Sequence, residues 1–235
     1  MRVAASQHLG PRTRQNDSYF HGSVFAAIAD GVGDTAEARA AADVAVDYYA
    51  ELAHNPDRER TGWIARVLLD APAEIATRLG DMKNPCSTTA AAVLLDENDV
   101  LWTSTIGDSR AFIFREGTVI FASTPHNRAA QIRLEQPGAT IPPSSNAILT
   151  RSLSACTVHL PDLSFLTIRA GDVIVLVTDG VDGTIGVEGI CDAIRHGNGD
   201  PDFAERRLMS ATAGQGLLDN ATCIVGVVRD RTDDR

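Results

Sequence analysis

Short apolar runs separated by turn-forming residues dominate the middle and the end of this chain. Such runs predict β-strands, because aliphatic and β-branched side chains pack well on a pleated sheet. The expected strands, in chain order, are 24–29, 88–95, 100–106, 110–114, 118–122, one near Ile148, 163–168, 173–177 and 222–228. Those from 88 to 122 follow one another across short turns, which is typical of a β-meander.

Apolar residues recur at helical spacing in two long segments that precede the meander. In the first, 35–54, small and aromatic residues fall on one face. The second begins near Thr61, and Pro72 should kink or restart it, because proline cannot donate a helical hydrogen bond. Shorter helices are expected at 129–135, 187–195 and 201–213.

The expected strands and helices come in blocks rather than in strict alternation. That order favours an α+β fold of stacked, mostly antiparallel sheets with helices outside, and argues against a doubly wound parallel sheet. No repeat, low-complexity tract or linker divides the sequence, so we expect a single domain over 1–235. The polar end, 229–235, is expected to be a disordered tail.

Composition narrows the classes of function. The 235 residues are 44% hydrophobic and carry a formal net charge of −10. This balance argues against nucleic acid and anionic membranes as partners, because both attract clustered lysine and arginine. The apolar runs are too short to span a bilayer, and the N-terminus lacks the apolar core of a signal peptide. We therefore expect a cytoplasmic protein.

Four aspartates stand at the ends of apolar runs that are far apart in the sequence. They are Asp30, Asp108, Asp179 and Asp219. Strands that end in carboxylates can bring several oxygen ligands to one place, and Mg²⁺ and Mn²⁺ prefer such ligands. The pattern predicts a two-metal hydrolase that acts on phosphate esters.

Other phosphatase chemistries fit the sequence poorly. Cys223 has Arg229 at the spacing of a thiol phosphatase, but the residues between them read as a strand, which would separate the two by roughly 20 Å. The segment around Asp182 resembles a haloacid-dehalogenase motif, but Gly180 stands where that family needs its nucleophilic aspartate. A serine nucleophile would need a Gly-x-Ser-x-Gly turn, which the sequence lacks.

Six short motifs follow one another in an order that identifies a family. They are Arg12-x4-Asp17, Asp30-Gly-Val-Gly33, Ser87-Thr-Thr-Ala90, Gly107-Asp-Ser-Arg-Ala111, Thr178-Asp-Gly180 and Asp219-Asn-x-Thr222. This set resembles the metal-dependent protein serine/threonine phosphatases of type 2C, in their short bacterial form. The match covers nearly the whole chain, and the Gly-Asp-Ser-Arg-Ala and Asp-Asn-x-Thr motifs are its most specific parts.

The resemblance implies a four-layer α-β-β-α sandwich with a metal centre at one end. Asp30 would bridge two Mg²⁺ or Mn²⁺ ions, and the Gly31 carbonyl would bind one of them. Asp179 and Asp219 would be further direct ligands. Three more residues have implied roles: Asp17 acts through ordered water, Asp108 helps to hold a weaker third ion, and Arg12 binds the substrate phosphate, for which Arg14 is an alternative.

The implied reaction is hydrolysis of phosphoserine and phosphothreonine in proteins, without a covalent intermediate. Two cations about 4 Å apart can share one water and lower its pKa toward neutrality, so that it attacks phosphorus. An arginine suits the phosphate because its planar fork pairs with two oxygens. The expected partner is a phosphorylated protein, such as the substrate of a serine/threonine kinase, and the protein is expected to be a monomer.

Several positions depart from the family pattern. Gln15 and Asn16 precede Asp17 where the family has Asn-Glu, which places the affinity of the second ion in question. Val32 stands where some eukaryotic members carry a histidine proposed as a general acid, so leaving-group protonation would fall to water. Gly183 replaces a carboxylate associated with the third ion, with Asp182 one residue early.

These departures keep a second hypothesis open. The chain could be a catalytically weak or inactive relative that binds a phosphoprotein partner. The segment 125–146, expected to form a flap over the site, would contact that partner in either case. Binding of two metal ions would separate the two hypotheses, because a scaffold has no need of them.

Overall fold

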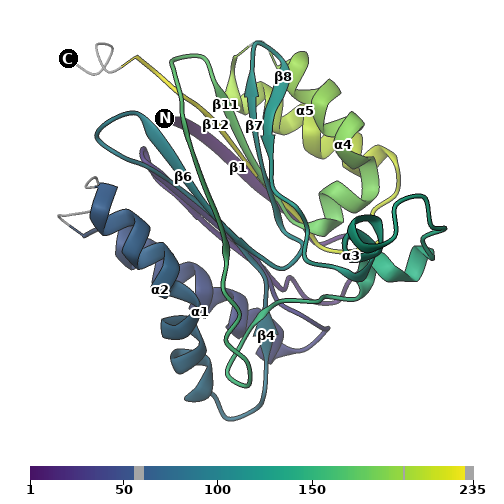
Figure 1. The fold of residues 1–235 in the computed structure, drawn as a ribbon. Helices are drawn as coiled ribbons and strands as arrows, with labels where there is room; N and C mark the ends of the chain where they lie inside the picture. Colours follow the sequence, from purple (N-terminus) through teal and green to yellow (C-terminus); the bar gives the residue numbers. More distant parts are fainter. Residues whose placement is uncertain (56–60, 198, 231–235) are drawn as a thin grey trace.

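A computed structural model describes residues 1–55, 61–197 and 199–230. Two five-stranded antiparallel sheets face each other, and a pair of helices covers the outer face of each (Figure 1). The first sheet contains, in spatial order, β1 (Arg2–His8), β12 (Ala221–Val227), β11 (Val173–Val177), β7 (Arg110–Arg115) and β8 (Thr118–Ala122). The second contains β10 (Asp162–Thr167), β6 (Val100–Ile106), β5 (Ala90–Leu95), β3 (Phe25–Asp30) and β2 (Asp17–His21). The predicted α-β-β-α sandwich is confirmed.

The layers follow from the two-residue period of the strands. In β5, Ala90, Ala92 and Leu94 pack against the helices α1 (Ala36–Ala53) and α2 (Thr61–Gly80). The alternate residues Ala91 and Val93 pack between the two sheets. Because both faces of this strand are covered, its sequence is a continuous apolar run rather than an alternating one.

The opposite outer face is covered by α4 (Asp179–Arg195) and α5 (Pro201–Gly214) (Figure 1). These helices bury a third apolar cluster against β7, β11 and β12. Both α1 and α5 begin as the sequence predicts. The Thr35 side chain accepts from the Ala38 amide at the start of α1, and Asp200 caps α5 just before a first-turn proline.

Two helices differ in extent from the prediction. Pro72 does not restart α2, which runs through it as one helix. Its apolar stripe is buried both before and after the proline, so tertiary packing outweighs the lost hydrogen bond. The helix expected at 187–195 is present as the second part of α4. Gly186, whose φ of 64° is not helical, separates it from a first part that begins at Asp179 and was not predicted. Gly183, Gly186 and Gly189 lower the helix propensity of this segment, so its sequence did not indicate the first part of the helix.

Some strands also differ from expectation. The expected strand 88–95 is two: β4 (Ser87–Thr88) pairs with β9 (Leu153–Ser154) in a small separate sheet, and β5 belongs to the second large sheet. Ile148 lies beside a bridge between Asn127 and Leu149 rather than in a strand. Strands β1 and β2, at the N-terminus, were not predicted, because their polar residues weaken the apolar signal.

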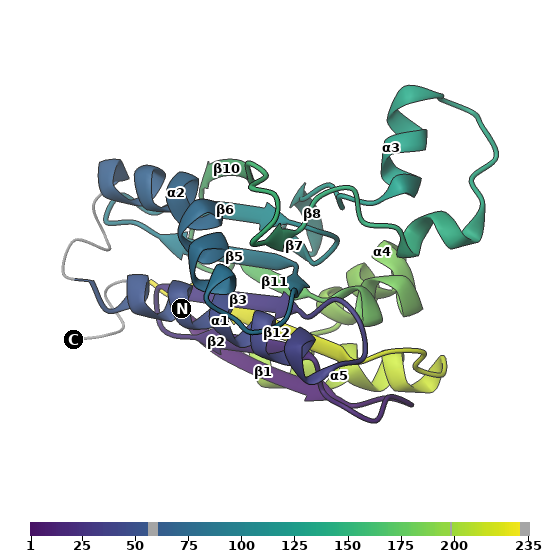
Figure 2. The same ribbon diagram turned by 90° about the horizontal axis from the view of Figure 1, so that it is seen from below.

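The expected flap, 125–146, lies beyond one end of the sandwich (Figure 2). It contains α3 (Arg128–Glu135) and a short 3-10 helix, Pro143–Ala147. Of the expected tail 229–235, only the first two residues are among those described. No helix in the described ranges combines the length and apolar character needed to cross a membrane.

Candidate metal centre

The expected ligands come together at the end of the sandwich nearest the flap. Asp17 begins β2 and pairs in register with Asp30, the last residue of β3. Asp179 follows β11, and Asp219 lies just before β12, which pairs antiparallel with β11. Asp108 lies in the turn between β6 and β7. Residues from both sheets thus converge because antiparallel strands end and begin at the same edge.

Asp17 is fully buried and is held by two threonines. Its Oδ2 atom accepts hydrogen bonds from Thr222 Oγ1 at 2.6 Å and from Thr178 Oγ1 at 3.0 Å. Its Oδ1 atom is buried without a hydrogen-bond partner. Burial, together with the charges of Asp179 and Asp219, raises the pKa of Asp17 to about 7. One oxygen is therefore fixed in place while the other is held out of water and available.

The carboxyl groups of Asp30 and Asp179 lie close enough for each to influence the pKa of the other. Desolvation comes first among the causes that raise the pKa of Asp30 well above its usual value, followed by the charges of Asp17 and Asp179. Burial also raises the pKa of Asp179, whose Oδ1 atom lacks a hydrogen-bond partner. Although each residue is partly exposed, its carboxyl group lies among protein atoms and other carboxyls. When ionised, these neighbouring carboxylates repel one another, and bound cations would relieve that repulsion.

The backbone of Asp30 is fixed by hydroxyl groups of the neighbouring strand. Thr88 Oγ1 donates to the Asp30 carbonyl at 2.8 Å, and Thr89 Oγ1 accepts from the Asp30 amide at 3.0 Å. Ser109 Oγ bonds Thr89 Oγ1 at 2.7 Å in turn. These serine and threonine residues stabilise the backbone near the site. Gly31 follows, and a Cβ there would overlap the Ala38 carbonyl, so only glycine fits this close approach.

Arg12 and Asp219 form an ion pair with each other. Arg12 Nη2 lies 2.5 Å from Asp219 Oδ2, and the two side chains are 37% and 35% exposed. The other carboxylate oxygen of Asp219 accepts from the Asn220 amide at 2.7 Å. The loop that carries Arg12 turns at Gly10, where φ is +61° and a Cβ would overlap the Asp219 carbonyl. Both carboxylate oxygens of Asp219 thus have protein partners, whereas Asp17 and Asp179 each have one oxygen without a partner.

Within the described ranges, no three His, Cys, Asp or Glu side chains are already arranged as a metal-binding group. Asp219, an expected ligand, is paired with Arg12 in this structure. An exposed pair of this kind is worth about 0–1 kcal/mol, whereas binding of a divalent ion gains much more. The remaining oxygens are hard donors suited to Mg²⁺ or Mn²⁺, so the donor set fits such ions.

Asp182 forms an ion pair with Arg110. Its Oδ2 atom lies 3.1 Å from Arg110 Nη1, and both side chains are largely buried. Arg110 also donates to the Ser123 carbonyl from Nε and Nη2, and its guanidinium lies over the ring of Phe112. Through Arg110, Asp182 at the start of α4 is thus linked to Ser123, just before the flap. Asp108, by contrast, is nearly buried, and burial raises its pKa to about 7.

A cavity of about 990 Å³ lies between the flap and the outer carboxylates of the cluster, and its lining does not include Asp17 or Asp30. Arg12, Asp108 and Asp179 line one side. Arg133 and Leu134 of α3 line the other. The cavity is large enough for a phosphorylated side chain and part of its peptide.

The sequence analysis gave no role to Thr178, Thr222 and Asn220, although all three lie in its motifs. The two threonines position Asp17, as described above. Asn220 Oδ1 accepts from the Asn16 amide, and Asn220 Nδ2 donates to the Leu9 carbonyl, so its side chain closes both ends of the Arg12 loop. A possible signal was the placement of these polar residues directly beside the aspartates at strand ends.

Cys223 does not belong to the site. It is fully buried in β12, and burial raises its pKa to about 12. A thiol with such a pKa is almost entirely protonated at neutral pH, so it is not a nucleophile. This excludes the thiol-phosphatase alternative.

The sequence matches the family described as Protein phosphatase 2C over residues 6–212. A serine/threonine protein phosphatase, PstP, of Mycobacterium tuberculosis is 30% identical over 247 residues, which cover 98% of this chain. Those residues make up 45% of the M. tuberculosis protein, so the chain spans about half of that relative's length. The mitochondrial protein phosphatase 1K of Xenopus laevis is 26% identical over 95% of this chain and 67% of its own.

Solved structures agree with the sequence comparison. The catalytic domain of PstP in complex with two manganese ions superposes with a TM-score of 0.81 at 26% identity, covering 97% of this chain and 98% of that one. A phosphatase of Mycobacterium smegmatis in complex with cacodylate gives a TM-score of 0.78 at 25% identity, covering 98% and 99%. With its sandwich fold and its convergent aspartates, the chain belongs to the protein phosphatase 2C family.

Proposed function

We propose that this chain hydrolyses phosphoserine and phosphothreonine esters in proteins with the help of two Mg²⁺ or Mn²⁺ ions. The observation that carries the proposal is the pair of buried carboxylate oxygens without hydrogen-bond partners, Asp17 Oδ1 and Asp179 Oδ1. They lie in a cluster of carboxyls beside an arginine. Membership of the family and the manganese-bound relative support the same conclusion.

The residues that would hold the ions are those of the carboxylate cluster. Asp30 would bridge the two ions, with the Gly31 carbonyl, Asp179 and Asp219 as further direct ligands. Asp17 would act through ordered water, for which its fixed, unpartnered oxygen is suited. When bound, two such ions supply an activated water and positive charge next to the phosphoryl oxygens.

Arg12 would bind the phosphate. Its present partner, Asp219, is itself an expected ligand, so loading the site would free the guanidinium. The planar fork can then donate to two phosphoryl oxygens and offset the charge that builds up on them. Val32 is 44% exposed near this site but carries no proton to donate, so the leaving oxygen would take its proton from water.

The donors present do not fit a third ion. Asp108 offers a carboxylate, but Asp182 is paired with Arg110, and Gly183 has no side chain to contribute. One protein carboxylate is a poor site for a hard divalent ion, which needs several oxygens. We therefore assign two ions to the site and derive no step from a third.

The direct test is release of phosphate from a phosphothreonine peptide by the purified chain with Mn²⁺ or Mg²⁺. We expect turnover with either ion and none after chelation. Failure to release phosphate with any divalent ion over a wide pH range would refute the proposal. Calorimetry with Mn²⁺ identifies the alternative, since an inactive phosphoprotein-binding relative would show no specific binding of two ions.

The remaining expectations concern the protein in its cell. Because the chain covers about half of the M. tuberculosis relative, its partners are inferred only from the site. We propose a phosphoprotein substrate made by a serine/threonine kinase, cytoplasmic residence and a monomeric state. Light scattering of the purified chain tests the last of these, and a stable dimer would contradict it.

A further inference from the structure

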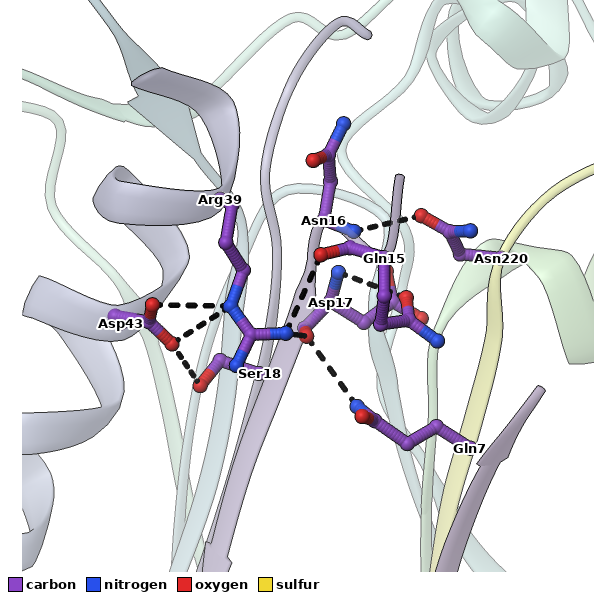
Figure 3. A network of polar contacts seen from close by, with 8 residues as sticks. All are labelled: Gln7, Gln15, Asn16, Asp17, Ser18, Arg39, Asp43 and Asn220. Atoms are coloured by element: carbon purple, nitrogen blue, oxygen red, sulfur yellow. Dashed lines mark hydrogen bonds and ion pairs between the residues drawn. The ribbon is translucent and has the colours of Figure 1, made fainter. Parts of the chain in front are cut away.

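Arg39, in the second turn of α1, contacts the metal centre without belonging to it (Figure 3). Its Nε atom lies 2.9 Å from both carboxylate oxygens of Asp43, four residues further along the helix. Its Nη1 atom donates to two backbone carbonyls outside the helix, at 2.7 Å to Asp17 and at 3.3 Å to Gln15. One guanidinium therefore ties α1 to the segment that leads into β2.

That segment carries two residues of the proposed reaction. Asp17 ends it, and Arg12 stands in the loop just before it. The carbonyl of Asn16, between the two that Arg39 binds, accepts from the Gly31 amide at 3.1 Å. Three consecutive carbonyls, those of Gln15, Asn16 and Asp17, thus all accept hydrogen bonds, and the Asp17 carbonyl also accepts from Gln7 Nε2 at 3.3 Å. Their hold fixes the direction in which the Asp17 side chain leaves the backbone.

Asp43 completes the arrangement. It accepts from Ser18 Oγ at 2.7 Å as well as from Arg39, so it also holds the start of strand β2 (Figure 3). The side chains of Arg39 and Asp43 are 38% and 43% exposed, so their mutual attraction is screened by water. An exposed ion pair contributes little to stability, but a forked donor with four acceptors constrains geometry. We therefore expect this pair to matter for the position of the backbone it binds rather than for the free energy of unfolding.

We propose that Arg39 and Asp43 form a positioning unit that sets Asp17 and the Arg12 loop for metal and phosphate binding. The inference rests on the proposed function, because it assigns a role toward the same site. Arg39 touches neither the substrate nor the ions, so it acts through the backbone that it holds. Lysine cannot replace it, because a single ammonium cannot reach the carboxylate and both carbonyls in this geometry.

The test compares Arg39→Lys with Arg66→Lys. Arg66 and Asp70 form an equivalent pair four residues apart on the neighbouring helix α2, with a 3.7 Å separation and side chains that are 83% and 60% exposed. Both variants keep the charge and remove the fork. A difference between them therefore reports on what Arg39 holds rather than on the loss of a surface ion pair.

The first readout is hydrogen–deuterium exchange of the metal-free protein. The amides of Asn16 and Asp17 are both hydrogen-bonded in the structure, so they should be protected. We expect Arg39→Lys to speed their exchange, with no change in the amides of β11, and Arg66→Lys to leave them as they are. Unchanged exchange of Asn16 and Asp17 in Arg39→Lys would overturn the inference.

The second readout is Mn²⁺ affinity by calorimetry. Loss of an outer contact to a metal site commonly weakens binding by about 10–100-fold, and we expect the lower end of that range for Arg39→Lys. Asp43→Asn, which keeps one acceptor for Arg39, should fall between wild type and Arg39→Lys. Wild-type affinity in both variants would contradict the inference.

Neither readout needs turnover. If the wild-type chain bound Mn²⁺ but released no phosphate, the proposed function would fail while faster exchange in Arg39→Lys would still support the positioning unit. If the chain is active, the kcat/KM of Arg39→Lys for a phosphopeptide should fall about tenfold, in line with its Mn²⁺ affinity. Urea unfolding confirms that each variant is folded at the temperature of the measurements.

Discussion

The two sides of the cavity are built in different ways. On the carboxylate side, Asp17 is fully buried, and its contacts come from Thr178 just after β11, from Thr222 in β12 and from Arg39 in α1. On the flap side, α3 has one fully buried residue, Ala129, and Leu134 is 84% exposed (Figure 2). The carboxylate side is held by several contacts between residues far apart in the sequence, whereas α3 is held mainly by contacts within its own segment.

The flap is nevertheless anchored at its base. The His126 amide donates to the Gly107 carbonyl, and the Thr150 amide donates to the His126 carbonyl, both at 2.8 Å. The His126 ring accepts from the Gly107 amide through Nδ1, and its Nε2 atom lies 3.1 Å from Asp162, without the alignment of a regular hydrogen bond. The carboxylates are thus carried by elements with many buried contacts, whereas α3 has few, and a segment with few buried contacts opens more easily.

The largest expected effect follows from the carboxylate side. Asp179→Asn replaces an anionic ligand by a neutral amide, so Mn²⁺ affinity should fall on the order of 100-fold or more, and phosphate release should fall with it. Asp70→Asn, on the exposed face of α2, is the control and should change neither. Calorimetry and peptide dephosphorylation measure both quantities. A fully active Asp179→Asn protein would remove this residue from the ligand set.

Metal loading should stabilise the two sides unequally. Mn²⁺ at 100 times its dissociation constant should raise the free energy of unfolding by about 2.7 kcal/mol, because the ion binds only the folded state. Chemical denaturation with and without chelator measures this. Amide exchange in α3 should hardly change, since α3 contributes no ligand. Equal protection of α3 and of the strands around Asp17 would break the comparison.

Thr222→Val tests the buried network beneath the cluster. The substitution keeps the shape but removes the 2.6 Å hydrogen bond to Asp17, which should cost about 2 kcal/mol in unfolding free energy. Thr77→Val, on the exposed face of α2, removes a hydroxyl that bonds its own helix and should change stability by less than about 0.5 kcal/mol. Equal urea midpoints for the two variants would show that Asp17 does not depend on Thr222.

The smallest expected effect comes from removing helix caps, which distinguishes the local stability of a helix from the unfolding free energy of the whole protein. Asn127 caps α3 by accepting from the Ala130 amide, as Thr35 caps α1 by accepting from Ala38. Replacing either by alanine should cost about 1 kcal/mol in its own helix. Thr35→Ala should lower the global unfolding free energy, because α1 is part of the core. Asn127→Ala should speed amide exchange in α3 alone, and a lowered global midpoint would show that the flap unfolds together with the sandwich.

The sequence by itself determined the parts that depend on local patterns. Strands such as Val100–Ile106 and Val173–Val177 follow from their apolar runs, and α1 follows from its helical spacing. The ordered motifs also placed the aspartates at strand ends, because a turn that follows a strand leaves its mark within a few residues. Fold and family were therefore within reach of the sequence alone.

Tertiary structure decided which of those groups are available. The Asp17–Thr222 bond joins residues 205 positions apart, and the Arg12–Asp219 bond joins residues 207 apart. No local pattern shows that Asp182 pairs with Arg110 or that Arg39 binds the Asp17 carbonyl. Nor does the sequence show that Pro72 stays inside α2. Such pairings arise only when distant strands pack, because burial and geometry then determine which polar atoms find partners.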